Sequence, residues 1–229
     1  MKKIIFFGTG SVAAELTSYL LDSDWAKDED IIIKGYLASD DKGIVNWQYY
    51  KYKSPYLGQL ADYQIKDEDN FVLALADPVI KRQIANLIDA RGGKFGNLIH
   101  PSCTIASTAQ IGVGNIFCPF VMLGPNVKMG NFNLLTSQSI ISHDSIVGNY
   151  NFFATSLLCG HTSIGNDNYC GIRSTTIPSI TIGDRNVIQA GMIVDKNVGD
   201  DATVFYRYKE KVMVIKQSKD SFGDSFRRE

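Results

Sequence analysis

Histidine is scarce in this sequence, and the arrangements of cysteine and charge that mark several protein classes are missing. Of 229 residues, three are histidine and four are cysteine, and the net charge is −1. The cysteines lie far apart with no C-x-x-C pair, so neither a zinc site nor a disulfide framework is indicated. A balanced charge without a block of Lys or Arg argues against nucleic acid as the main partner.

Long apolar runs are also missing. No apolar run reaches the length of a membrane span. The start, MKKIIFFGTG, has only four apolar residues before Gly8, which is too short for the core of a signal peptide. Because 45% of the residues are hydrophobic, the chain can build one or two domains with a real core. We therefore expect a soluble, cytoplasmic protein with reduced cysteines and no membrane span.

Residues 1–97 alternate between strand and helix patterns. The segments 3–7, 30–37 and 70–76 are short apolar runs typical of buried strands, and residues 11–21 place apolar side chains at helical spacing. A second helix is predicted after Asp77 as N-cap, with Pro78 in the first position and a glycine stop. This alternation predicts a parallel sheet. Residues 42–63, rich in tyrosine, are predicted to be an irregular connection.

From residue 99 a six-residue period replaces the helical signal. With one skipped residue near position 158, fifteen of sixteen periodic positions are apolar, and they fall at 105, 111, 117, 123, 129, 135, 141, 147, 153, 158, 164, 170, 176, 182, 188 and 194. Such a hexapeptide period is typical of a β-solenoid. One inward residue per hexad forms one flat side, and three sides close a coil. Glycines that follow the periodic residues are expected to supply freedom at the corners.

His143 and Asp144 interrupt the apolar stretch SIISHDSIVG (139–148). They follow inward Ile141, so both are free to point outward. Neighbouring coils lie about 4.8 Å apart. If the skipped residue precedes position 158, Gly160 lies under His143 and His161 under Asp144. If it follows position 159, His161 lies directly under His143. Either register gathers two histidines, a carboxylate and a glycine on one outer patch.

These features together resemble bacterial sugar acyltransferases of the hexapeptide-repeat class. That class includes sialic acid O-acetyltransferases and N-acetyltransferases of nucleotide-linked amino sugars. The matching motifs are FFGTGSVAAEL, NLIHPSC (97–103) and the His143–Asp144 pair. The resemblance extends to about residue 200. It implies a Rossmann-like domain at 1–97, a left-handed parallel β-helix at 98–200 and a C-terminal extension at 201–229.

The resemblance also implies a homotrimer that binds acetyl-CoA and sugar in clefts between adjacent β-helices, with no metal. His143 corresponds to the family's base, Asp144 to its acid, and Gly160 to the glycine whose N–H binds the acyl carbonyl. The positions along CoA correspond to Ile172, Ala190 and Gly191. The sequence departs from the family at Thr136, where asparagine is common, at Phe152, where some members have a second histidine, and at YRYKEK (206–211), which replaces G-x-P-A-K. Thr136 and His161 are kept as candidate substrate contacts.

The glycine turn at Gly8 and Gly10 has the pattern G-x-G-x-x-A, which lets a backbone approach phosphate at a helix N-terminus. An NAD site would have an acidic residue about 20 residues further on. Asp40 and Asp41 come later than that, which favours a nucleotide-sugar over NAD. Lys81 falls where the family often has arginine. The candidate nucleotide-sugar contacts are therefore Gly8, Gly10, Asp40, Asp41 and Lys81.

The sequence thus predicts an acyl-CoA-dependent N-acyltransferase, with acetyl as the acyl group, that acts on the amino group of a nucleotide-linked deoxy-aminosugar in surface glycan biosynthesis. His143 would take the proton, Asp144 would orient the imidazole, and the Gly160 N–H would stabilise the oxyanion. Two alternatives stay open: a sialic acid O-acetyltransferase, and a non-catalytic nucleotide-sugar-binding β-helix protein. A zinc enzyme on the same fold would need three converging histidines. His100 lies more than two coils from His143 and is expected to be a packing or inter-domain residue.

Overall fold

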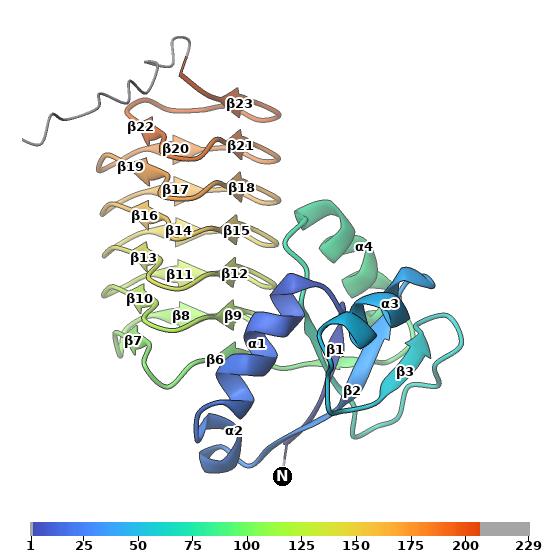
Figure 1. The fold of residues 1–229 in the computed structure, drawn as a ribbon. Coiled ribbons are helices and arrows are strands. Elements are labelled where there is room, and N and C mark those ends of the chain that lie inside the picture. Colours follow the sequence, from blue (N-terminus) through green and yellow to red (C-terminus); the bar gives the residue numbers. More distant parts are fainter. Residues whose placement is uncertain (1, 207–229) are drawn as a thin grey trace, which may run out of the picture.

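A computed structural model describes residues 2–206. A sheet domain stands beside a tall stack of coils, and α1 runs along the side of that stack (Figure 1). None of the helices in the described part of the chain has the length and apolarity needed to span a bilayer. Residues 207–229, which hold most of the predicted C-terminal extension and all of YRYKEK except Tyr206, lie outside the described residues.

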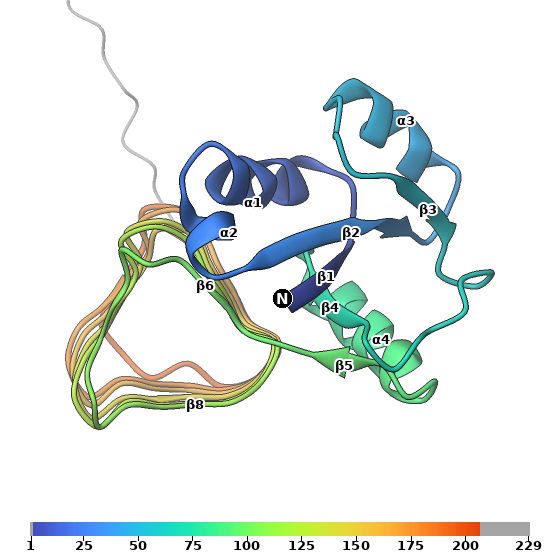
Figure 2. The same cartoon turned by 90° about the horizontal axis from the view of Figure 1, so that it is seen from below.

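Five parallel strands form the sheet of the first domain, in the order β3-β2-β1-β4-β5. Its side chains alternate between two cores: one face packs on α1, and the opposite face packs on α4. The two faces are visible end-on in Figure 2. The strands are β1 (Lys2–Phe7), β2 (Ile31–Ala38), β3 (Tyr56–Gln59), β4 (Asn70–Leu73) and β5 (Lys94–Phe95), and the helices are α1 (Ser11–Leu21), α2 (Trp25–Asp28), α3 (Lys42–Tyr49) and α4 (Pro78–Asp89).

The start of α4 follows the predicted capping pattern. Asp77 Oδ1 accepts a hydrogen bond from the Ile80 N–H at 2.9 Å, and Pro78 is the first helical residue. The prediction of an irregular connection at 42–63 is wrong, because this segment forms α3 and the edge strand β3. Tertiary contacts stabilise this regular structure. The backbone of β3 pairs with β2, and the Trp47 indole donates to the Ser54 carbonyl at 2.9 Å.

Three parallel sheets, each built from two-residue strands, form the stack of coils. The first β-helix sheet, which faces α1, contains β6 (Leu98–Ile99), β9 (Ile116–Phe117), β12 (Leu134–Leu135), β15 (Phe152–Phe153), β18 (Tyr169–Cys170), β21 (Val187–Ile188) and β23 (Thr203–Val204). The second contains β7 (Thr104–Ile105), β10 (Met122–Leu123), β13 (Ile140–Ile141), β16 (Leu157–Leu158), β19 (Thr175–Thr176) and β22 (Ile193–Val194). The third contains β8 (Gln110–Ile111), β11 (Lys128–Met129), β14 (Ile146–Val147), β17 (Ser163–Ile164) and β20 (Thr181–Ile182).

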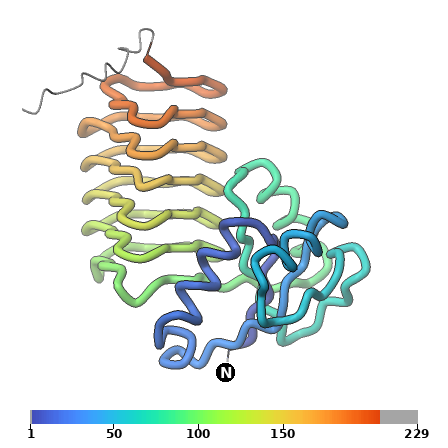
Figure 3. Tube along the Cα trace, viewed as in Figure 1, coloured from blue at the N-terminus to red at the C-terminus, as the bar shows by residue number. Residues whose placement is uncertain are grey.

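The inward residue of each strand is its second one, at the periodic positions predicted from the sequence. From Phe117 to Val194 all of these side chains are buried. The parallel pairing of every third strand fits a left-handed β-helix, and the coils stack regularly in the trace of Figure 3. Strand β23 pairs with β21, so the stack continues through Val204.

The register of the coils decides which residues meet at the corners. Leu135 pairs with Phe153, but Phe153 then pairs with Cys170, which is one residue sooner than the period requires. Ile141 likewise pairs with Leu158. The skipped residue therefore lies between Phe153 and Leu158, and the first of the two predicted registers is confirmed. In this register Gly160 follows His143 in the stack, and His161 follows Asp144.

Most of the corners are not formed by glycine, contrary to the prediction, although Gly114 and Gly191 do carry a positive φ of 71° and 72° at corners. A positive φ recurs about once per hexad, and it is carried by Asn126, Phe132, Gln138, Asp144, Tyr150, Thr155, His161, Asp167, Arg173, Ser179 and Arg185. The glycines that follow inward residues have a different role. At Gly112, Gly130, Gly148, Gly165 and Gly183 an added Cβ would overlap atoms of the next coil. These positions need glycine because neighbouring coils approach closely.

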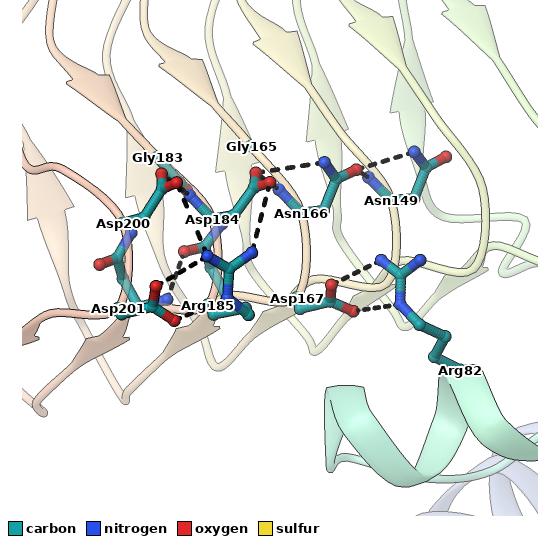
Figure 4. Close-up of polar contacts among 12 residues, drawn as sticks. Arg82, Asn149, Gly165, Asn166, Asp167, Gly183, Asp184, Arg185, Asp200 and Asp201 are labelled. Atoms are coloured by element: carbon teal, nitrogen blue, oxygen red, sulfur yellow. Dashed lines mark hydrogen bonds and ion pairs between the residues drawn. The ribbon is translucent and has the colours of Figure 1, made fainter.

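Side-chain ladders link the coils at the corner nearest α4. Asn149, Asn166 and Asp184 each donate a backbone N–H to the side chain one coil later (Figure 4). At the same corner Arg82 of α4 forms a bidentate ion pair with Asp167, with N–O distances of 2.9 and 2.5 Å. This pair, together with the apolar packing of α1 on the first β-helix sheet, joins the two domains.

Candidate functional site

The histidine and carboxylate that the sequence singled out lie together at one corner of the coil stack. His143 Nδ1 is 2.8 Å from Asp144 Oδ2. Both residues lie in the turn from β13 to β14, at the corner between the second and third β-helix sheets. Asp144 has φ 57°, a left-handed conformation that Asp adopts more readily than most residues. The turn therefore places the carboxylate beside the preceding imidazole.

Asp144 is held as a carboxylate by its neighbours. The Asn126 amide donates to Asp144 Oδ1 at 3.0 Å from one coil earlier. The hydrogen bond from Asn126, followed by that from His143, lowers the pKa of Asp144 below its ordinary value. An ionised carboxylate only accepts hydrogen bonds. The shared proton therefore belongs on His143 Nδ1, which leaves a lone pair on Nε2.

Asn126 was not identified from the sequence. The signal was present, because Asn126 occupies the same corner column as Asp144, one coil of eighteen residues earlier. Short polar residues at successive corners of a solenoid are near enough to pair, since the coils are about 4.8 Å apart. Stacking the sequence in both directions from Asp144 would have shown this contact.

Gly160 lies directly beneath the His143 ring. A Cβ added at Gly160 would be 2.6 Å from both Cε1 and Nε2 of the imidazole. This position therefore requires glycine while the ring keeps its place. The Gly160 N–H donates none of the hydrogen bonds found within residues 2–206. Its column also contains Pro125 and Pro178, which have no N–H to give. The coil ladder does not use the N–H group at this position.

The remaining two histidines have separate environments. His161 lies under Asp144, with Nε2 3.9 Å from Asp144 Oδ2, and its ring meets that of His143 edge-on at 5.2 Å. His100 packs edge-on against Trp25 at 4.9 Å and bonds Ser102 Oγ at 2.7 Å. Burial lowers the pKa of His100. His100 is thus an inter-domain packing residue, as predicted.

The glycine turn lines a separate cavity of about 360 Å³ at the carboxyl ends of β1, β2 and β4. Gly8 has φ 111°, and its missing Cβ would lie 2.8 Å from the Ala74 carbonyl oxygen. Gly10 precedes α1, whose first turn has no side-chain cap and no acidic residue. Tyr52 Oη donates to the Thr9 and Gly10 carbonyls at 3.2 and 3.1 Å and supports the turn from behind. The free N–H groups of the helix end suit a phosphate.

Of the three charged residues predicted around this cavity, only one lines it. Asp40 lies on its rim and accepts a hydrogen bond from the Lys42 N–H at 3.0 Å. Asp41 instead accepts from Gln59 Nε2 at 2.8 Å. Lys81 is 1% exposed and donates to the Phe132 carbonyl at 3.3 Å, on the side of α4 that faces the β-helix. This enclosed position contradicts the predicted contact of Lys81 with a nucleotide-sugar.

A second cavity, also of about 360 Å³, lies between α1 and the first β-helix sheet. It shares Ser11, Val12 and Ala76 with the glycine-turn cavity, so the two cavities are adjacent. Thr136 and Ile172 both line it, and among the described residues Glu15 is the one charged residue that lines it. Ala190 and Gly191 are exposed at the corner between the first and second β-helix sheets, one coil after Ile172. The Gly191 N–H donates to the Ile172 carbonyl at 2.7 Å.

The structure thus assembles two groups of predicted residues and keeps them apart. His143, Asp144, Gly160 and His161 lie at the corner opposite the first β-helix sheet, which we call the histidine corner. The glycine turn, Thr136 and Ile172 lie on the side of that sheet. His143 and His161 are 55% and 61% exposed in the single chain, so the histidine corner is an open surface rather than a closed pocket.

The solved structures that share this architecture include the following three, although no protein-family model and no curated protein matches this chain. PerB from Caulobacter crescentus, in complex with CoA and GDP-perosamine, is 19% identical with a TM-score of 0.76, covering 88% of this chain and 92% of that one. The acetyltransferase domain of PglB from Neisseria gonorrhoeae is 19% identical with a TM-score of 0.74, covering 89% and 96%. WeeI from Acinetobacter baumannii is 20% identical with a TM-score of 0.74, covering 87% and 94%. Over nearly its whole described length, this chain has the fold of these proteins.

Proposed function

We propose that the chain is an acetyl-CoA-dependent N-acetyltransferase that acts on the amino group of a nucleotide-linked deoxy-aminosugar in surface glycan biosynthesis. The observation that carries this proposal is the His143–Asp144 pair lying over Gly160, on a fold shared with PerB, which was solved with CoA and GDP-perosamine. A histidine oriented by a carboxylate, next to an unused backbone N–H, has the parts that acyl transfer requires.

His143 acts as the general base through Nε2. Asp144 accepts a hydrogen bond from the Nδ1–H and so fixes the tautomer, as the carboxylate does in a Ser-His-Asp triad. The sugar nitrogen attacks the thioester carbon while Nε2 takes its proton. The tetrahedral intermediate then collapses with loss of the CoA thiolate, which receives the proton from the imidazolium. Asn126 positions Asp144 through its second oxygen.

The Gly160 N–H is the proposed oxyanion donor. It belongs to the column of Pro125 and Pro178, so its use by a ligand removes no hydrogen bond from the coil ladder. The Gly160 backbone lies against the Nε2 side of the ring. A thioester carbonyl bound there would be next to the base, which is the arrangement that oxyanion stabilisation requires.

The nucleotide-sugar would bind in the glycine-turn cavity and in the adjacent cavity between α1 and the first β-helix sheet. Its phosphates would meet the N–H groups at Gly10 and Ser11 at the start of α1, with Asp40 near the ribose or base. The sugar would extend into the second cavity toward Thr136. There Glu15 supplies a negative charge next to an amino group. This charge favours an amine over the hydroxyl of sialic acid as the acceptor.

A homotrimer would bring the two groups of residues together. In one chain the base lies at the corner between the second and third β-helix sheets, while the sugar cavities lie on the first sheet. The second and third sheets expose Met122, Ile146 and Ile193 at 46%, 52% and 57%. Contact between copies would bury this apolar surface and close the histidine corner against a neighbour's cavity, with Ile172, Ala190 and Gly191 along the acyl-CoA.

The test is an assay of the purified chain with acetyl-CoA and a panel of UDP-, dTDP- and GDP-linked aminosugars, with sialic acid as the hydroxyl acceptor. Thiol release measures turnover, and mass spectrometry identifies the acetylated product. Acetylation of an amino group supports the proposal, and acetylation of sialic acid alone replaces it with the O-acetyltransferase. Binding of a nucleotide-sugar without acetyl-CoA binding would favour the non-catalytic alternative.

A further inference from the structure

We propose that His143, Asp144 and His161 also form a binding site for a divalent transition-metal ion, and that the bound ion blocks acyl transfer. The binding half of this inference stands on geometry alone, whereas the inhibition half rests on the proposed function. The sequence pattern did not predict the site, because His100 was the third histidine sought. In the structure Asp144, and not a third histidine, is the third ligand of the site.

One ligand atom from each of the three residues lies within 4.8 Å of the other two. The measured contacts are 2.8 Å between His143 Nδ1 and Asp144 Oδ2 and 3.9 Å between His161 Nε2 and the same oxygen. Zinc binds histidine nitrogen and carboxylate oxygen at about 2.0–2.2 Å. Side-chain rotations that move these atoms by about one ångström bring all three onto one ion.

The backbone already places these three residues side by side at one corner of the coil stack. Asp144 and His161 are equivalent corner residues of consecutive coils, with φ 57° in both, and the His161 N–H donates to the His143 carbonyl at 3.0 Å. The three side chains are partly exposed, so they rotate without disturbing the core. Asn126 holds the second carboxylate oxygen, as outer-shell partners do around metal ligands.

The ligand types select the metal. Two imidazoles and one carboxylate suit zinc and its neighbours in the first transition row rather than Mg²⁺ or Ca²⁺, which take oxygen ligands. Three protein ligands leave a fourth position of a tetrahedron open to water. The resulting site is a surface site of moderate affinity, since it must compete with the His143–Asp144 hydrogen bond.

Metal binding removes the base whichever nitrogen of His143 is used. Coordination through Nε2 occupies the lone pair that would accept the substrate proton. Coordination through Nδ1 displaces the proton from that atom onto Nε2, which then becomes a donor and accepts nothing. In both cases Asp144 exchanges its bond to the imidazole for a bond to the ion.

Calorimetry of Zn²⁺ binding to the full chain tests the site without requiring catalysis. We expect one ion per chain, and a loss of affinity of at least tenfold in His143→Gln and in His161→Gln. His100→Gln is the matched histidine control, and Cys159→Ser tests the nearest thiol in the sequence; both should bind zinc as the wild type does. Unchanged affinity in His161→Gln, or loss of binding in Cys159→Ser, would overturn the proposed ligand set.

Acyl transfer then tests inhibition. We expect Zn²⁺ to lower kcat/KM with an inhibition constant equal to the Kd from calorimetry, and a chelator to restore full activity. Zinc binding at this site without inhibition would overturn the second half of the proposal. If no acceptor supports turnover at all, the proposed function fails, and the calorimetric result still decides whether the metal site exists.

Discussion

The imidazole of His143 lies on the backbone of Gly160, so close that one added methyl group would be 2.6 Å from Cε1 and Nε2. Gly160→Ala should push the ring away from Asp144 and lower kcat/KM by roughly 10- to 100-fold, because misplacement of about 1 Å has effects of this size. Gly199→Ala is the matched control, since a methyl group added there would have no atom of residues 2–206 within 4 Å. Equal activity in both variants would show that the ring position is not needed.

His143→Ala removes the proposed base. We expect kcat/KM to fall by roughly 10²–10⁴, while the thermal stabilisation produced by acetyl-CoA and by the nucleotide-sugar is retained. The measurement combines steady-state kinetics with thermal shift for each ligand. Full activity in this variant would mean that the substrate amine needs positioning only, and that His143 is not the base.

Asn126→Ala removes the largest influence that lowers the pKa of Asp144. A carboxyl group with a lowered pKa is ionised, and contributes its interactions, above its unfolded pKa, and it loses them as the pH falls through its folded pKa. Without Asn126 that loss should begin at a higher pH. Carbon NMR titration of Asp144 should therefore show a raised midpoint, and Asn126→Asp should not restore the wild-type value. An unchanged midpoint would contradict the role of Asn126.

Glu15→Gln removes the one charge that the described part of the chain places in the lining of the second cavity. If Glu15 attracts the amino group of the sugar, KM for the nucleotide-aminosugar should rise by roughly 5- to 50-fold, which corresponds to about 1–2 kcal/mol of binding free energy. KM for acetyl-CoA should be unchanged. Glu29→Gln, just before the amino end of β2, is the control substitution. A rise in both KM values would indicate a structural effect instead.

Lys81→Met replaces a buried cation by an apolar side chain of similar length. Burial lowers the pKa of Lys81 to about 7, against a weaker opposite effect of Asp77. Below pH 7 both folded and unfolded chains carry this proton, so the folded chain bears the full cost of burying the charge. As the pH rises from 7 toward 10.5 the unfolded chain holds more protons, and the wild type gains stability.

We therefore expect Lys81→Met to be more stable than the wild type at pH 6, by about 1–4 kcal/mol, with the difference shrinking toward pH 9. Chemical denaturation at both pH values measures this. A difference that does not depend on pH would mean that Lys81 does not titrate in this range. Lys128→Met, on the exposed face of β11, should show no such change.

The period of six was sufficient to predict the coil stack, because a solenoid buries one residue at each step and repeats that requirement along the chain. The capping residues Asp77 and Pro78 likewise determined the start of α4 from local chemistry alone. His143, Asp144 and Gly160 were found for the same reason. Gly160 lies one coil after the His143–Asp144 pair, so counting along the sequence places it next to that pair.

Only the tertiary structure decided the contacts that depend on a choice of register or on packing between domains. The skipped residue fits the sequence on either side of Leu158, and the hydrogen-bonded ladder selects the one that stacks His161 under Asp144. Lys81 follows a helical pattern that does not say what will cover α4, and the β-helix covers it. The strand β3 forms because an edge of β2 is open to it. The local sequence does not predict such contacts, because the residues that stabilise these segments are distant in the chain.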